Sequence, residues 1–411
     1  MAAAHGHAGQ HAGDPALPSP PTVRRAVVAV LVPLVLATLA GLVLLWPGDE
    51  RPTVVGADRV DATVLDVYPC ADALQPDDEA PPGATPTEEC LEALVRVGAG
   101  PDEGEELLVP LPYGAGVPEF AAGDEVVLGG IPGAPLESRY EVLDLQRTTP
   151  LLLLAVLFSL AVVALSRWRG VAALVGLGLS VVVLATFVLP ALLAGEPPLA
   201  VAVVGSSAIM IVTLYLSHGL SVRTSVALLG TLVSLTITGL LGAYFTRAAS
   251  FAGLADESAA YLGSLESGID VRGLLLAGLV IGALGVLDDV TVTQTAAVWE
   301  VARADPDASR RGLVSAGLRV GRDHVAATVN TLVLAYAGAA LPSLLLFAVA
   351  GQGVVDTVTT ELVAQEVVRA LVGGLGIVAA VPITTVLAAL AVRERPSRRG
   401  RRARGPVGAE P

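Results

Sequence analysis

The chain of 411 residues is poor in charge and contains no lysine, so all 25 of its basic residues are arginines. Only 16% of the residues are charged and 53% are hydrophobic, a balance that excludes an ordinary soluble domain. The sequence also lacks a P-loop, zinc-ligand spacing and a Ser-His-Asp arrangement. We therefore expect a membrane protein that is not an enzyme and that binds no cofactor, metal ion or nucleic acid.

Cysteine is almost absent, because Cys70 and Cys90 are the only two in the chain. Their spacing differs from the C-x-x-C pattern of thiol redox sites. A bond between them would close a loop of about 20 residues and stabilise the fold by about 3 kcal/mol. We expect this disulfide, which requires an oxidising compartment.

The first part of the chain changes abruptly from small residues to an apolar run. Residues 1–23 are rich in Ala, Gly, His and Pro and are expected to be a disordered cytoplasmic tail. Residues 26–46 are apolar throughout and long enough to cross a bilayer. A cleaved signal peptide is the alternative, but "LVLLWPGDE" offers no small-residue cleavage site. We expect a retained first transmembrane helix.

Residues 47–148 lose this apolar density and hold 22 acidic side chains against five arginines, as expected of a water-facing domain. Short runs typical of strands are separated by Pro and Gly. We expect a small extracytoplasmic β domain, OB-like in its arrangement, with Greek-key and irregular β alternatives open. The runs are "VDATVLDVY", "CLEALVRV", "EELLVPL", "GDEVVLGG" and "RYEVLDLQ".

Seven further apolar segments predict a seven-helix transmembrane domain over residues 149–391, followed by a basic cytoplasmic tail at 392–411. With the first helix, the fold class is a membrane α-helical bundle of about eight transmembrane helices. Alternate threading from a cytoplasmic N-terminus places 17 of the 25 arginines inside, as the positive-inside rule requires, with both termini cytoplasmic. The segments are 150–165, 171–194, 199–216, 225–246, 273–298, 324–349 and 370–391.

Three stretches together resemble one known family: "RWRGVAALVGL", "GALGVLDDVTVTQTAAVWE" and "GLRVGRDHVAATVNTLVLAYAGAALPSLLLF". The chain resembles the YibE/F family from about residue 54 to residue 391, a range that includes the extracytoplasmic domain. The resemblance implies a bacterial multi-pass protein of the plasma membrane. It assigns no biochemical activity.

Two adjacent aspartates, Asp288 and Asp289, lie within the sixth apolar segment. A single aspartate near the centre of a transmembrane helix costs about 2.5–3.5 kcal/mol, so both should face protein or water. Asp289 follows a stripe of small residues that would let another helix approach closely. The stripe consists of Gly278, Gly282 and Gly285.

The next segment carries Asp323 near the interface and Asn330 seven residues further inward, at about the depth of Asp289. We expect the Asp289 carboxylate to pair with the Asn330 amide, with Thr293 or Thr331 completing the contact. Alternatively, Asp289 caps a second half-helix where the segment breaks. The expected substrate or ion pathway comprises Asp288, Asp289, Thr291, Thr293, Gln294, Asp323, Asn330 and Thr331.

Other polar groups allow two interpretations. Hydroxyls on the neighbouring segments line a pathway or form interhelical hydrogen bonds. His218 and His324 lie at predicted cytoplasmic ends, where each is either solvated or relays protons. The tail residues His5, His7 and His11 bind metal weakly at most. The face on one segment consists of Thr224, Thr231, Ser234 and Thr238 with Gly242, and the group on the other consists of Ser206 and Ser207 with Gly205.

These features favour a transporter or channel for a small solute or ion. One alternative is a non-catalytic envelope or sensory component whose acidic outer domain binds a partner. Another is an intramembrane aspartyl protease, which the roughly 100° between adjacent helical side chains disfavours. The expected partners are the lipid bilayer and an unidentified solute, and a homo-oligomer stays open.

Overall fold

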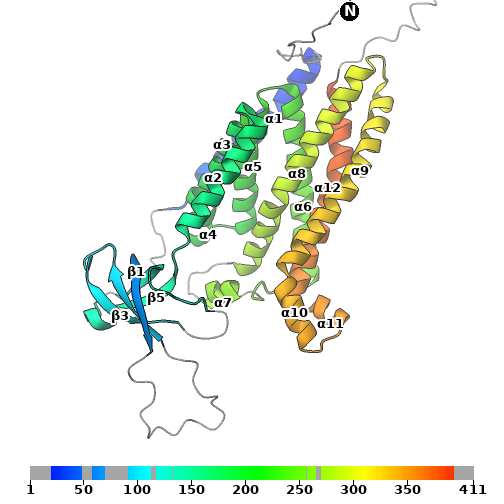
Figure 1. Ribbon diagram of the computed structural model, residues 1–411. Coiled ribbons are helices and arrows are strands. Elements are labelled where there is room, and N and C mark those ends of the chain that lie inside the picture. The colour runs from blue at the N-terminus through cyan, green and yellow to red at the C-terminus, as the bar shows by residue number, and fades with distance from the viewer. Residues whose placement is uncertain are drawn as a thin grey trace, which may run out of the picture. The chain divides into compact units, whose positions relative to one another are not determined.

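The computed structural model describes residues 20–48, 58–69, 91–112, 117–131, 133–255, 257–264 and 270–392. It divides into two compact units, one formed by Thr53–Arg167 and the other by Met1–Pro52 with Trp168–Pro411. Figure 1 shows the first as strands with one long helix and the second as a helical bundle. Each unit is described by itself below.

The smaller unit contains a five-stranded antiparallel sheet in the order β3-β2-β1-β4-β5. Each of the five predicted runs overlaps one strand. The sheet curls, because its two edge strands β3 and β5 also approach each other. The strands are β1 (Asp58–Pro69), β2 (Leu91–Val97), β3 (Glu106–Pro110), β4 (Glu125–Gly130) and β5 (Tyr140–Leu145).

Alternation along the strands builds the core of this sheet. Ala93, Val95 and Val97 of β2 are buried, as their period of two predicts. They pack with Val64 of β1 and Leu128 of β4. The pairing of β1 with β2 shifts between Val64 and Asp66, an irregularity of the kind that bends a strand and helps a sheet to curl.

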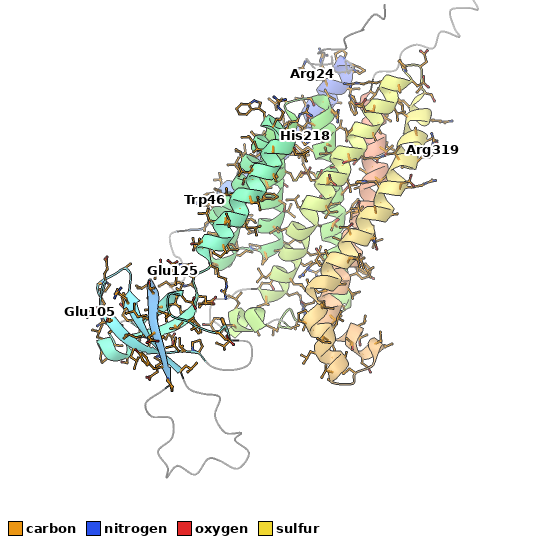
Figure 2. The ribbon with its side chains drawn as sticks, viewed as in Figure 1. Arg24, Trp46, Glu105, Glu125, His218 and Arg319 are labelled. Atoms are coloured by element: carbon orange, nitrogen blue, oxygen red, sulfur yellow. The ribbon has the colours of Figure 1, made fainter. Side chains whose placement is uncertain are left out.

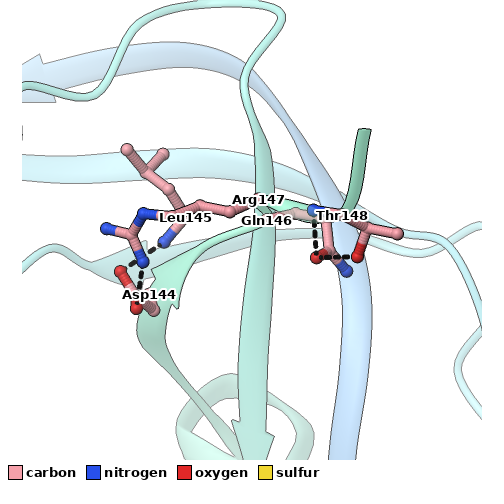
Figure 3. Close-up of polar contacts among 5 residues, drawn as sticks. All are labelled: Asp144, Leu145, Gln146, Arg147 and Thr148. Carbon is pink, nitrogen blue, oxygen red and sulfur yellow. Dashed lines mark hydrogen bonds and ion pairs between the residues drawn. The ribbon is translucent and has the colours of Figure 1, made fainter. Parts of the chain in front are cut away.

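The sheet continues almost directly into helix α2 (Thr148–Ser166). In Figure 3, the Gln146 side chain accepts from the Thr148 hydroxyl at 2.6 Å, and Arg147 pairs with Asp144 at 2.5 Å. Gln146 also donates to Asp61 of β1 at 2.8 Å. These contacts fix the start of the helix against the sheet.

The larger unit is a membrane α-helical bundle. Among the described residues of the whole chain, seven helices are long and apolar enough to cross a membrane, or eight if the bent pair α9 and α10 is one span. The helices of this unit are α1 (Pro21–Leu44), α3 (Trp168–Val183), α4 (Leu189–Leu193), α5 (Pro198–His218), α6 (Val222–Ala248), α7 (Glu257–Ser264), α8 (Val271–Ala304), α9 (Arg310–Ala339), α10 (Leu341–Val349), α11 (Val354–Thr359) and α12 (Glu361–Ala391).

Most helices extend beyond the predicted segments, and α12 begins at Glu361, nine residues before the predicted start at 370. Three further differences concern individual helices. Helix α1 begins at Pro21, inside the predicted 1–23 tail, because proline is well accepted in the first turn. A π-helical turn at Leu184–Val188 joins α3 to α4. Helix α9 begins at Arg310 and bends by 56° into α10, so the predicted segment 324–349 is not straight.

Helices α6, α8 and α12 pack against one another at the centre of the bundle. Close packing depends on glycines that face threonines. Gly230 of α6 lies against Thr384 of α12, and Gly376 of α12 lies against Thr238 of α6. Because glycine has no Cβ, each hydroxyl reaches the facing backbone. Polar side chains are thereby brought into the middle of an apolar bundle.

Candidate functional site

Helix α8 runs without interruption through both aspartates. Asp288 lies 17 positions after Val271, about 25 Å along the axis at the helical rise, and so near the middle of the helix. The interpretation of Asp289 as the cap of a second half-helix is therefore wrong. Both carboxylates need another explanation, because a continuous helix leaves no free amide in its interior for them to accept from.

The two aspartates have different surroundings. Asp288 is partly buried, and its Oδ1 is enclosed without a hydrogen-bond partner. Asp289 is exposed on the surface of the bundle. Asp288 is therefore the aspartate that faces the protein interior, whereas the glycine stripe had indicated Asp289.

The glycine stripe itself faces outward. Gly278, Gly282 and Gly285 are exposed, and a Cβ added at Gly278 or Gly285 would meet no atom within 4 Å. At Gly282 it would approach only the Tyr336 hydroxyl. Among the described residues, the helix contact along this stripe is therefore limited to Tyr336 of α9, and α8 packs mainly through its opposite face, which carries Leu287, Val290 and Gln294.

Helix α9 turns its predicted polar residues away from the bundle. Its inner face carries Gly317, Gly321 and Leu332, which are buried. Asp323, Asn330 and Thr331 are exposed. Thr293 on α8 is also exposed, and no hydrogen bond in the described part of the chain joins Asp289 to Asn330. The structure does not bring the expected pair together.

Two predicted residues of α8, Thr291 and Gln294, point inward and make the central polar contacts. The hydroxyl oxygens of Thr291 and Thr231 lie 2.6 Å apart across the α6–α8 interface. Gln294 donates to the Thr385 hydroxyl of α12 at 2.6 Å and to the Gly317 carbonyl of α9 at 2.8 Å. These contacts join four helices through α8.

Several buried hydroxyls of the bundle have no partner among the described residues. The side-chain oxygens of Ser206, Ser234, Thr295 and Thr384 are enclosed, and each residue is 0% exposed. A buried hydroxyl without a partner costs free energy unless water or a ligand satisfies it. The bundle centre therefore has hydrogen-bonding capacity that its own side chains do not use.

Sequence reasoning placed the hydroxyls of α6 on one face, and the structure buries Thr224, Thr231, Ser234 and Thr238 there. Reasoning from the sequence missed the contribution of α12. The sequence "PITT", residues 382–385, supplies Thr384 and Thr385, both 0% exposed. Adjacent threonines beside a proline inside an apolar segment were the available signal, since lipid-facing positions rarely carry them.

The two histidines of the bundle occupy different positions. His218 ends α5 and is exposed, and Figure 2 shows it toward the end of the bundle at which Arg24 also lies. The Nε2 of His324 on α9 is enclosed without a partner. Among the described residues, no group of three or more His, Cys, Asp or Glu could hold a metal ion. The tail histidines and the two cysteines lie outside the described residues.

A charged group lies within α12 as well. Arg369 pairs with Glu366 at 2.5 Å, and its guanidinium lies 5.8 Å from the centre of the Tyr336 ring. Both charged side chains are about one quarter exposed. Charge at this position is balanced within the pair, whereas no described cation lies within ion-pair distance of Asp288.

The arrangement provides oxygen ligands, proton donors and proton acceptors at the middle of a membrane-spanning helix. No curated protein and no solved structure matches the chain. The model of the YibE/F-like protein family matches residues 154–394, more than half of the chain, from within α2 to just beyond α12. The match does not extend over the β sheet, which the resemblance had been expected to include. The chain belongs to the YibE/F-like family.

Proposed function

We propose that this integral membrane protein is a transporter or channel that moves a small solute or ion past Asp288. The observation that carries the proposal is the Oδ1 of Asp288, enclosed without a partner near the middle of α8. Ionisable residues kept at such a position generally mark a substrate or ion pathway, because an unused charge there is costly. The proposal gives the chain no catalytic role.

The pathway in this proposal differs from the one that the sequence predicts. It runs between α6, α8 and α12 and uses Asp288, Thr291 and Gln294 together with Thr231 and Thr384. Burial of Thr231, Thr291, Gln294 and Thr384 and the free hydroxyl of Thr384 support the revision. Asp289, Thr293, Asp323, Asn330 and Thr331 have no part in it within one chain, because all five are exposed.

The proposed location is the bacterial plasma membrane, with both termini in the cytoplasm and residues 47–148 outside. The distribution of arginine supports this orientation, because Arg24 in α1, Arg223 in α6 and Arg303 in α8 are all near helix ends that the threading puts inside. Reporter fusions after Arg167, Arg223 and Arg404 should all report cytoplasm. A fusion that reports the outside would overturn the topology.

For the outer domain we propose an OB-like barrel. Strand β1 pairs with both β2 and β4, and the edge strands β3 and β5 approach each other, as in a partly open five-stranded Greek-key barrel. Small barrels of this kind commonly bind ligands. The Cys70–Cys90 disulfide belongs to the same proposal, and both cysteines lie outside the described residues.

Transport can be tested by solute and proton fluxes in proteoliposomes that contain the parent chain, Asp288→Asn or Asp289→Asn. We expect Asp288→Asn to reduce the flux by about 10²-fold or more, the usual scale for losing an essential proton-transfer group. The substitution keeps a hydrogen-bonding side chain of similar size, so the protein should still insert and fold.

Asp289→Asn is the matched control, since it removes the same charge from the next position, which is exposed. Its flux should stay within a factor of a few of the parent. Full activity of Asp288→Asn, measured on any solute that the parent transports, would refute the proposed site.

A further inference from the structure

A row of hydroxyls connects Asp288 with the end of the α6–α8 interface. On α8, Thr291 and Thr295 follow Asp288 at the third and seventh positions, so the three side chains share one helix face. On α6, Thr224 and Thr231 are seven positions apart and share a face in the same way. All four threonines are at most 4% exposed.

The depths of these residues follow from the contacts between the two helices. Thr231 meets Thr291, whereas Gly242 further along α6 meets Leu276 and Leu279 earlier on α8, so the helices are antiparallel. Thr224 lies about 10 Å below Thr231, and Thr295 lies about 6 Å below Thr291, at the rise of 1.5 Å per residue. Thr295 therefore falls between Thr231 and Thr224 in depth.

The row opens to solvent at the N-terminus of α6. The Thr224 hydroxyl lies 2.8 Å from the hydroxyl of Ser221, the N-cap of α6, and Ser221 is exposed. Thr224 also contacts the carbonyl oxygen of His218 at 3.4 Å. Polar groups thus extend from the surface to the middle of α8, over a depth of about 20 Å.

Two hydrogen-bond orientations are available at the centre of the row. In one, Thr231 donates to the Ala227 carbonyl at 3.1 Å and accepts from Thr291. In the other, Thr231 donates to Thr291, and Thr291 donates to the main-chain carbonyl oxygen of Asp288 at 3.1 Å. A proton relay needs such a reversible pair, because each transfer leaves the chain oriented the opposite way.

The proposed row requires a bridging water at each gap between its hydroxyls. The free hydroxyl of Thr295 is fully buried and can accept from and donate to a water on either side. Separations of about 5–6 Å between successive side chains of one helix face correspond to one bridging water each. The unused hydrogen-bonding capacity of Thr295 is then satisfied.

We propose that the α6–α8 interface is a proton path from Ser221 through Thr224, Thr295, Thr231 and Thr291 to Asp288. The inference deepens the proposed transport function by naming the proton as its coupling ion. Each hydroxyl or water accepts one proton on a lone pair and releases its own to the next group. The last transfer forms an O–H bond on the Asp288 carboxylate, and no electron is exchanged.

The surroundings of Asp288 agree with a proton as the charge that neutralises it. The titratable groups on α8 and on helices packed against it include Asp289 on α8 itself, Tyr215 and His218 on α5, Arg223 on α6, Arg322, Asp323, His324 and Tyr336 on α9, and Glu366 and Arg369 on α12. None of them forms an ion pair or hydrogen bond with the Asp288 carboxylate in the described part of the chain. One carboxylate among neutral hydroxyls has no cage of ligands for a divalent cation.

The path can be tested on the full-length protein in lipid without knowing the solute. Infrared spectroscopy should show a protonated carboxyl band that Asp288→Asn removes and Asp289→Asn leaves in place. After transfer to deuterated buffer, the rate at which this band shifts reports proton access to Asp288. We expect Thr295→Val to slow the shift about tenfold, the effect of removing one hydrogen-bonding position.

Two variants separate the path from general packing. Thr236→Val changes an exposed hydroxyl on α6 and should leave the exchange rate unchanged. Thr295→Ser keeps a hydroxyl at this position, so its carboxyl band should exchange at the rate of the parent. Absence of a band assignable to Asp288, parent-like exchange in Thr295→Val, or a band that responds to sodium rather than to pH would each overturn the proton path. A solute flux that survives such a result would leave the transport function standing, so the two proposals can fail separately.

Discussion

The hydroxyl oxygens of Thr231 and Thr291 lie 2.6 Å apart at the α6–α8 interface, and both side chains are 0% exposed. Each hydroxyl has a second contact within its own helix, with the carbonyl oxygen of Ala227 or of Asp288. The interhelical bond is thus one of two that each threonine can make. Its contribution to stability should be modest, because a separated helix in lipid keeps the other.

We predict that Thr231→Val and Thr291→Val destabilise the bundle slightly and not additively. A double-mutant cycle should give a coupling free energy of about 0.6 kcal/mol, the average for such bonds between membrane helices. Unfolding in mixed micelles, followed by circular dichroism, measures it. Additive losses from the two single variants would mean that no bond forms between the hydroxyls.

Glycines in the bundle should differ sharply in their tolerance of alanine. A Cβ at Gly376 would collide with the Thr238 hydroxyl and approach Leu287, so Gly376→Ala should cost about 1–3 kcal/mol of unfolding free energy through overpacking. Gly278 meets nothing within 4 Å, so Gly278→Ala should be neutral or stabilise by up to about 1 kcal/mol through helix propensity. Unfolding of both variants under one condition tests the contrast.

The same comparison bears on oligomerisation. If Gly278→Ala proved as costly as Gly376→Ala, another chain would have to pack on the exposed stripe of α8. The expected result, a neutral Gly278→Ala, leaves the stripe without a close helix contact. Light scattering of the detergent-solubilised variants would show whether the mass of the particle changes.

Hydrophobic length and period predicted the elements well, because a bilayer or a half-buried sheet imposes them directly on the sequence. The side of α8 that each residue occupies, buried or exposed, was harder to predict. Gly278, Gly282 and Gly285 mark a face that could admit a close neighbour, but the large residues Leu287 and Val290 on the other side occupy the core. Small residues permit a contact without specifying it, so the interior aspartate was misassigned to Asp289.

The polar partners across helices were also beyond sequence reasoning. The contact of Gln294 with Thr385 joins positions 91 residues apart, and it depends on the packing of α8 against α12. No local pattern encodes which of several apolar helices become neighbours. Depth can be counted along a span from its ends, whereas the rotation of one helix toward another depends on all the contacts together.

In the β domain we predict an acid-sensitive stability that depends on Asp102. The Tyr140 hydroxyl and the Arg139 guanidinium donate to its Oδ2 at 2.7 and 2.6 Å, and these bonds lower the pKa of the Asp102 carboxyl below its ordinary value. A carboxyl with a lowered folded-state pKa stabilises the fold above its unfolded-state pKa. That contribution is lost as the pH falls through the lowered value.

Hydrogen exchange of the full-length protein can test this expectation. Peptides of β2 and β4 should lose protection as the pH falls below about 4, near the ordinary pKa of an aspartate, after correction for the intrinsic exchange rate. Asp102→Asn should flatten this dependence, because the amide does not titrate. An unchanged acid response in that variant would assign the effect to other carboxylates, such as Asp144 beside Arg147.

The last prediction concerns Cys70 and Cys90, which lie outside the described residues. The pairing of β1 with β2 is described up to Pro69 opposite Leu91. In the sequence, Cys70 directly follows Pro69 and Cys90 directly precedes Leu91. Opposing residues of such a ladder have Cα atoms about 4.5–5.5 Å apart, within the range of about 4.4–6.8 Å that a disulfide spans. We therefore expect a bridge between the two cysteines, which would close a loop of about 20 residues and stabilise the β domain by about 3 kcal/mol.

Alkylation under denaturing, non-reducing conditions should leave both cysteines of membrane-extracted protein unmodified, and prior reduction should expose both. Reduction should also lower the protection of β1 and β2 against hydrogen exchange. The variant with both cysteines replaced by alanine serves as the control, since a reductant should not change its exchange. Two alkylated cysteines without reduction would refute the bridge.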